Sequence, residues 1–309
     1  MEKILYILVR AFLVIISLMP LEVVARIGRF LGAVAYFIDA KHRKTAISNL
    51  TLVFPDKTLD EARALAFENF KRIGENFLCA AKTFTMKKEE LEKRVEFVGV
   101  EKLEKASRSS PDGSVVVAIG HFGNFELYAR FWEFANGLKC ATTYRSLKHK
   151  SFDRLLQMLR EKTGCHYFER RSEADKLRKF MHSGRVVLGL LADQHAGDKG
   201  VRVPFFGRDC STSAAPALFA QRYKSALFTA ICYRLSLAKW RIEIGDEIPV
   251  ELNGKHRNVN DICVDINRAF ENAILRDPAN WFWVHNRWKA PPKKFSHTHN
   301  VTIYEHRAD

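Results

Sequence analysis

The sequence predicts an α/β protein in which helices flank a central sheet, with an apolar helical segment at the N-terminus. Short runs of apolar and β-branched residues alternate with helix-like runs along most of the chain. The 309 residues are 47% hydrophobic and 28% charged, which suits a folded chain with a substantial core and excludes a disordered one. We therefore predict a segment over residues 1–44 and one main domain over residues 45–309.

The N-terminal segment consists of two apolar stretches, residues 4–19 and 21–38, separated at Pro20. A membrane-spanning helix needs roughly 20 uninterrupted apolar residues, and four charged residues break these stretches: Arg10, Glu22, Arg26 and Arg29. We expect a helix lying in the membrane interface or a tilted anchor with snorkelling arginines. The basic run 41–44 follows at once and suits anionic headgroups and a cytoplasmic position.

Two other interpretations of this segment stay open. It has features of a secretory signal peptide, with Lys3 as the charged region and a weak cleavage site at residues 23–25, but Arg10 interrupts its apolar core. The other interpretation is an ordinary buried helical hairpin packed on the main domain.

The main domain begins with a helix capped at Thr58 and continues with alternating strands and helices. The predicted strands are residues 95–98, 115–119, 141–144, 186–191, 226–233 and 240–244. The predicted helices are residues 125–134, 152–162, 173–182, 214–223 and 259–275.

The most informative stretch is Val-Val-Val-Ala-Ile-Gly-His-Phe-Gly-Asn-Phe-Glu at 115–126, an apolar strand that delivers His121. Residues five apart on one helix lie about 140° apart, so His121 and Glu126 can meet only if His121 precedes the helix. With Asn124 as the helix cap, the ring can fold back towards Glu126, and the pair becomes a catalytic dyad with His121 as general base. Gly123 leaves room for substrate. The alternative is an ordinary strand-end histidine and a helix-face acid.

Polar residues also follow the next strands of the predicted sheet. Arg145 comes after one strand, at the edge where α/β proteins bind ligands, and either clamps a phosphate or pairs with a surface acid. Asp193 and Gln194 follow another strand, where they hold Arg145 or a substrate hydroxyl, or form a structural turn.

Cofactors and metals are not expected. Six cysteines are scattered without a Cys-x2-Cys pair, which indicates neither a disulfide framework nor a zinc site. Residues 193–198 include two aspartates and a histidine, but their spacing matches no established metal-binding motif. The net charge of +15 implies an anionic partner, and because the basic residues are interleaved without a nucleic-acid-binding motif, we expect a phospholipid surface, an acidic carrier or a phosphorylated sugar rather than nucleic acid.

The stretch at 121–126 resembles the His-x4-Asp/Glu block of the glycerolipid acyltransferases, and especially the branch that acylates lipid A precursors. Further similar blocks follow in order at 143–145, 191–194 and 203–207, the last including Phe206, and at 281–289 near the C-terminus. Asn49, Leu50 and residues 53–55 are similar to the family's N-terminal block. The serine- and alanine-rich segment 210–216 departs from the family pattern, which leaves the choice of acyl chain and acceptor open.

The resemblance implies a mixed central sheet, His121 and Glu126 as catalytic residues, and substrate contacts from Arg145, Asp193, Gln194, Gly123, Asn124 and Phe206. It implies an O-acyltransferase that moves a fatty acyl chain from acyl carrier protein, or from acyl-coenzyme A, to a hydroxyl of a lipid A precursor at the cytoplasmic face of the bacterial inner membrane. Trp281, Trp283 and Trp288 are expected to pack on the active-site sheet. The alternatives are another lipid acceptor, such as a lyso-phospholipid, an aminolipid or a phosphatidylinositol glycoside, and a non-enzymatic basic protein that binds membranes.

Overall fold

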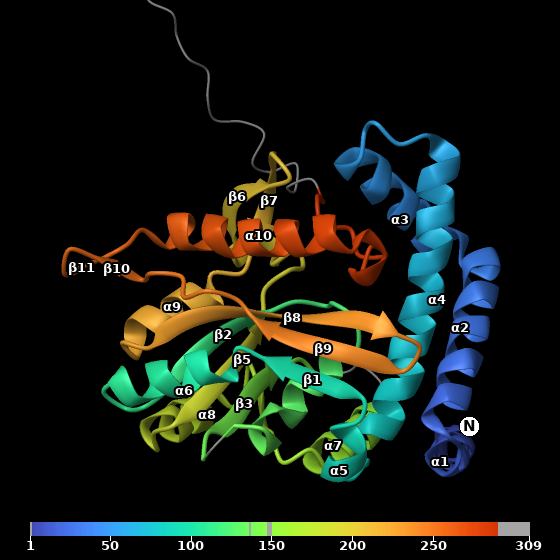
Figure 1. Cartoon of the computed structure of the whole chain (residues 1–309), viewed down its shortest axis with the longest axis horizontal. Coiled ribbons are helices and arrows are strands. Elements are labelled where there is room, and N and C mark those ends of the chain that lie inside the picture. The colour runs from blue at the N-terminus through green and yellow to red at the C-terminus, as the bar shows by residue number, and fades with distance from the viewer. Residues whose placement is uncertain (1, 136, 147–149, 290–309) are drawn as a thin grey trace, which may run out of the picture.

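A computed structural model describes residues 2–135, 137–146 and 150–289 and confirms the α/β class (Figure 1). Seven strands form the central sheet in the order β1-β9-β8-β2-β5-β3-β4. Neighbouring strands are parallel except for β8 and β9, so the sheet is mixed. The strands are β1 (Val95–Val98), β2 (Val115–Ile119), β3 (Lys139–Tyr144), β4 (His166–Glu169), β5 (Val186–Leu191), β8 (Ala226–Ser236) and β9 (Lys239–Ile244).

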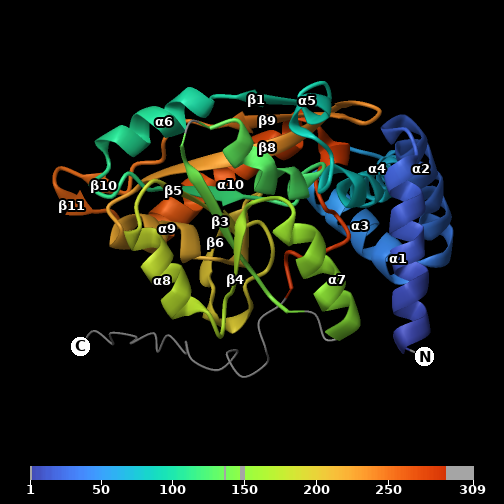
Figure 2. The ribbon, with the colours of Figure 1, turned by 90° about the horizontal axis from the view of Figure 1, so that it is seen from below.

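Helices cover both faces of this sheet (Figures 1 and 2). Val116 and Ala118 of β2 belong to a core shared with the helices α8 (Ala174–His182), α9 (Ala215–Arg222) and α10 (Val259–Arg276). The alternate residues Val115, Val117 and Ile119 belong to a second core with α6 (Val100–Ser109) and the 3₁₀ helix η1 (Phe125–Glu133). Because β2 is buried on both faces, its sequence is a continuous apolar run rather than an alternating one.

The long helices that precede the sheet are α1 (Glu2–Leu18), α2 (Leu21–Ile38), α3 (Ala40–Val53) and α4 (Leu59–Thr83). The Thr58 cap of α4 is confirmed, since the side chains of Thr58 and Glu61 form a reciprocal capping box. The predicted boundary after residue 44 falls inside α3. Within the described part of the chain, every helix is too short or too polar to cross a bilayer. Several large apolar side chains of α1 and α2 nevertheless face solvent, among them Leu18, Phe30, Phe37 and Ile38.

Glycines allow α2 and α4 to cross closely. Gly28 and Gly32 of α2 face Gly74 of α4, and a Cβ added at Gly28 would lie 2.5 Å from the carbonyl oxygen of Gly74. Because that oxygen belongs to the backbone, it cannot turn away as a side chain would. This crossing positions α4, which carries residues of the functional site described below.

Gly28→Ala is therefore expected to destabilise the protein by about 1–3 kcal/mol, because the added methyl group must push the two helices apart. Urea unfolding of the full chain measures the effect. Val34→Ala, on the exposed side of the same helix, serves as the control and should change the free energy of unfolding by less than about 0.5 kcal/mol. Equal stability of the two variants would contradict the close crossing.

Some elements lie outside those predicted from the sequence. They include α3, a four-residue α5 (Lys88–Leu91), the edge strand β4, and the hairpins β6 (Val201–Phe205) with β7 (Arg208–Thr212) and β10 (Glu251–Leu252) with β11 (Lys255–His256). The helix α7 (Lys150–Glu161) starts two residues before its predicted range. The predicted helix at 125–134 is η1, whose first turn closes with a bond from Leu127 N–H to the Asn124 carbonyl, three residues back.

Candidate active site

His121 lies in the turn that follows β2, at the carboxyl edge of the sheet, as predicted. Its side chain is 16% exposed. The parallel strand β5 lies beside β2, with Ile119 paired to Leu191, so the residues two positions beyond each strand emerge next to each other. Those residues are His121 and Asp193.

Asp193 is the carboxylate that holds the His121 ring. Its Oδ1 lies 2.8 Å from His121 Nδ1, and its Oδ2 accepts bonds from the backbone N–H of His121 at 2.8 Å and from Trp281 Nε1 at 2.9 Å. Burial of Asp193 favours the neutral acid, but the neighbouring His121 ring and these hydrogen bonds hold the pKa of the carboxyl below its ordinary value. An ionised Asp193 keeps the proton of the neutral imidazole on Nδ1 and leaves Nε2 as the basic nitrogen.

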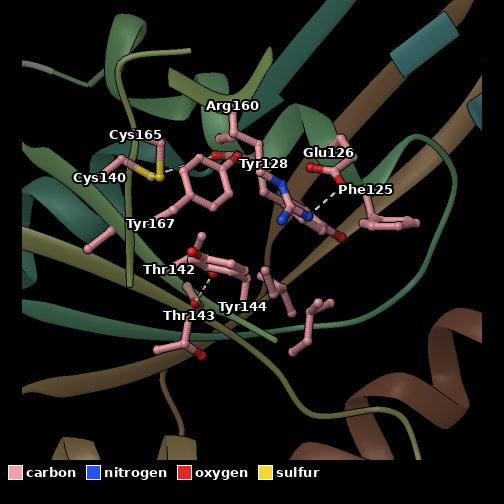
Figure 3. Close-up of a pocket in the computed structure, with 15 residues that line it drawn as sticks. Phe125, Glu126, Tyr128, Cys140, Thr142, Thr143, Tyr144, Arg160, Cys165 and Tyr167 are labelled. Carbon is pink, nitrogen blue, oxygen red and sulfur yellow. Dashed lines mark hydrogen bonds and ion pairs between the residues drawn. The ribbon is translucent and has the colours of Figure 1, made fainter. Parts of the chain in front are cut away.

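The predicted contact between His121 and Glu126 is wrong. Glu126 pairs instead with Arg160 of α7, with 3.1 Å between its Oε1 and the Nη2 of Arg160 (Figure 3). The turn at Gly123, with φ of +50°, and the 3₁₀ geometry of η1 direct the Glu126 side chain towards α7. Asp193 was expected to hold Arg145 or a substrate hydroxyl, and it holds His121 instead.

Aromatic rings surround the imidazole. The ring centroids of Phe125 and Phe282 lie 4.7 and 5.8 Å from that of His121, and Phe77 of α4 packs against both phenylalanines at 6.1 Å. Phe77 is 51% exposed, so the apolar surround of His121 continues to the surface. Phe125 also lines a cavity of about 60 Å³ whose walls include residues of η1, β3, α7 and β4 (Figure 3). The imidazole therefore lies in an environment suited to an apolar substrate.

The tryptophan-rich segment after η3 (Pro278–Asn280) forms the floor of the site. Trp281 and Trp283 are buried, as predicted. Phe122 and Trp281 form an isolated antiparallel β-bridge. The amide of Asn69 on α4 donates to the carbonyls of Ala279 and Trp281, and the amide of Asn49 on α3 donates to those of Trp283 and His285. The N-terminal helices thus fix the segment that carries the indole bound to Asp193.

Gly123 and Asn124 have structural contacts in this turn. The N–H of Gly123 donates to the Asn280 carbonyl, and a Cβ at Gly123 would lie 2.5 Å from the carbonyl oxygen of Cys232, so its lack of a side chain is needed for packing. The Asn124 side chain does not cap η1; it is buried, with its amide 3.5 Å from the hydroxyl of Thr83. The backbone N–H of Phe122 also has a partner within the protein, because it donates to the Gly120 carbonyl.

The other predicted substrate residues are dispersed. Arg145 is exposed directly after β3 at the carboxyl edge of the sheet. The Gln194 carbonyl accepts from Arg287, 3.5 Å away. Phe206 lies in the turn between β6 and β7, where its N–H donates to Glu271 at 2.6 Å. Their roles in substrate binding stay predictions. Within the described residues, no cluster of three or more His, Cys, Asp or Glu side chains is placed to bind a metal.

Arg287 and His285 belong to the block at 281–289, whose basic residues were expected to face the substrate. Arg287 is fully buried and donates to the Ser211 carbonyl and to the hydroxyl of Thr212, tying the C-terminal segment to β7. His285 Nε2 accepts the N–H of His195 at 3.0 Å, so this nitrogen carries no proton. Burial lowers the pKa of His285 to about 4.

His285 should make stability depend on pH. Its folded pKa lies below the ordinary value of 6.5, so the stability that its neutral ring contributes is complete above pH 6.5 and is lost as the pH falls towards about 4. Because the ring is partly exposed, we expect a loss of about 1 kcal/mol between pH 7 and pH 5. Urea unfolding of the wild type and of His285→Gln at pH 7 and pH 5 measures this loss of unfolding free energy. A parallel decline in both proteins would refute the role of His285.

A histidine oriented by a buried carboxylate at the carboxyl edge of an α/β sheet is typical of enzymes that use the imidazole as a general base. Residues 1–290 match the family of bacterial lipid A biosynthesis acyltransferases. The chain belongs to this family, as the resemblance of its motifs predicted.

Relatives that carry lipid A biosynthesis names are distant in sequence but match the chain over most of their length. The lipid A biosynthesis palmitoleoyltransferase of Escherichia coli (strain K12) is 23% identical over 286 residues, which cover 89% of this chain and 87% of that protein. The lauroyltransferase of the same organism is 22% identical over 276 residues, covering 89% and 88%. A lipid A biosynthesis acyltransferase of Haemophilus influenzae is 23% identical over 285 residues, covering 89% and 86%.

Proposed function

We propose that this acyltransferase transfers a fatty acyl chain from an acyl thioester to a hydroxyl of a lipid A precursor, with His121 as general base. The observation that carries the proposal is the bond between His121 Nδ1 and the buried Asp193, which leaves Nε2 available as a base in an apolar surround. The relatives named above act in lipid A biosynthesis, which supports the acceptor.

In the proposed reaction, the acceptor hydroxyl gives its proton to His121 Nε2 and its oxygen attacks the thioester carbonyl carbon. Asp193 stabilises the imidazolium that forms. The tetrahedral oxyanion then collapses, the carbon–sulfur bond breaks, and the departing thiolate takes the proton from His121. The products are an ester and a free thiol. Arg145, at the same edge of the sheet, is proposed to bind a phosphate of the acceptor.

Acyl carrier protein is the proposed donor, because the net charge of +15 favours association with an acidic protein. The proposed location is the cytoplasmic face of the bacterial inner membrane. The exposed apolar side chains of α1 and α2, together with the basic residues that begin α3, would lie in the membrane interface. Recovery of the protein in the soluble fraction of broken cells would contradict this location.

Mass spectrometry of membrane lipids tests the function. Cells that produce the wild-type protein should contain lipid A heavier by one fatty acyl group than cells that produce His121→Ala. If the mass difference appears on a lyso-phospholipid, an aminolipid or a phosphatidylinositol glycoside, the chemistry is right and the acceptor is wrong. If no lipid differs, the proposed activity is refuted.

A further inference from the structure

The cavity beside the active site combines apolar walls with buried polar atoms. Its apolar lining includes Ile119, Ala129, Ala141 and Leu191. Cys140 and Cys165 also line it, with their sulfur atoms 3.1 Å apart (Figure 3). Phe125, which touches the His121 ring, lines the same cavity. A small cavity with such walls suits an unbranched chain better than a sugar headgroup.

The ion pair between Glu126 and Arg160 lies in the wall of this cavity. Both side chains are largely buried, at 15% and 14% exposure. The Arg160 guanidinium lies over the rings of two tyrosines, with its Cζ atom 5.7 Å from the Tyr144 ring centroid and 5.0 Å from that of Tyr167. These contacts fix the orientation of the guanidinium, so its remaining N–H groups have defined directions.

Two hydrogen-bonding groups at this ion pair have no partner. Arg160 Nε and the hydroxyl of Tyr167 are buried, and neither is hydrogen-bonded within the part of the chain that the structure describes. Burial and the charge of Glu126 raise the pKa of Tyr167, so its hydroxyl keeps its proton and can donate. Buried donors without partners are costly, so each one calls for an explanation, and a ligand that accepts from both groups provides one here.

We propose that this cavity binds the donor's acyl chain near its thioester end and that Arg160 Nε and the Tyr167 hydroxyl select a chain bearing a hydroxyl group. A hydroxyl oxygen has two lone pairs and can accept from both groups at once, whereas a plain methylene leaves both unpaired. The inference rests on the proposed function, because it takes the cavity to be occupied by the acyl chain that His121 helps to transfer.

Binding to the full-length His121→Ala protein tests the selection without turnover. The probes are pantetheine thioesters of one chain length with an unsubstituted, a 2-hydroxy or a 3-hydroxy acyl chain, and titration calorimetry gives each Kd. We expect one hydroxyacyl probe to bind about tenfold more tightly than the unsubstituted probe. Adding Tyr167→Phe should remove most of this preference while weakening binding of the unsubstituted chain little.

Tyr233→Phe is the matched control, because Tyr233 also lies under an arginine, Arg276 at 4.2 Å, but belongs to β8 outside this cavity. It should keep the preference. Equal binding of all three probes, or a preference that survives Tyr167→Phe, would overturn the inference. Loss of acyl transfer by the wild-type protein with every donor, alongside an intact binding preference, would refute the proposed function and leave the selection standing.

Discussion

Replacement of His121 by alanine is expected to lower kcat for acyl transfer by about a hundredfold to ten-thousandfold, the usual contribution of a general base. This corresponds to roughly 3–5 kcal/mol of transition-state stabilisation. The side chain is partly exposed and the backbone N–H that binds Asp193 remains, so the fold should persist. Purified variant and wild-type protein, assayed with an acyl thioester and a lipid A precursor, provide the measurement.

His256→Ala is the control for this experiment. His256 lies in the β10–β11 hairpin, where its ring is exposed and pairs with Glu251 on the adjacent strand. It should retain the kcat of the wild type. Turnover of His121→Ala within a few-fold of the wild type would remove the base from the mechanism. A non-enzymatic membrane-binding protein would consume no thioester in either form.

The position of His121 could be predicted because its cause is local. Residues 115–119 are apolar without interruption, which indicates a strand buried on both faces, and Gly120 ends that strand just before the histidine. A residue at the carboxyl end of a buried parallel strand faces the ligand edge of the sheet, whatever the order of the other strands. The same reasoning placed Arg145 and Asp193 at that edge.

The carboxylate partner could not be found in this way, because it depends on strand order. The chain runs from β2 through β3 and β4 before it forms β5, and only in the folded sheet does β5 lie beside β2. Spacing within one segment favoured Glu126, which is near in sequence, over Asp193, which is 72 residues away. Two apolar strands that each end in a titratable residue are a signal of such a pair, but they do not reveal which strands are neighbours.

Short and irregular elements were missed for related reasons. The strand β4 has four residues at the edge of the sheet, too few for a periodic pattern. The strand β6 contains Pro204, which argues against a strand in sequence and is tolerated here in an isolated two-stranded hairpin. The capping role expected for Asn124 failed because η1 is a 3₁₀ helix and the asparagine side chain is buried against Thr83.

Asp193→Asn distinguishes the two candidate partners of His121, and we expect it to lower kcat by about a thousandfold. The two carboxylate oxygens of Asp193 bind N–H groups of His121 and Trp281, whereas an asparagine has only one accepting oxygen. Its amide N–H groups would lie against one or more of these N–H donors and could not bond to them. The ring would then lose its preferred tautomer and orientation. The unmatched polar groups should also cost about 1–3 kcal/mol of stability, so urea unfolding must accompany the kinetic assay.

Glu126→Gln is the matched comparison, because it makes the same carboxylate-to-amide change five residues after His121. Glu126 binds Arg160 and not the ring, and a glutamine can still accept from that guanidinium, so kcat should fall by less than about tenfold. If Glu126→Gln instead lost activity as severely as His121→Ala while Asp193→Asn stayed active, the carboxylate serving the base would be Glu126. Asp193 would then anchor only Trp281 and the turn after β2.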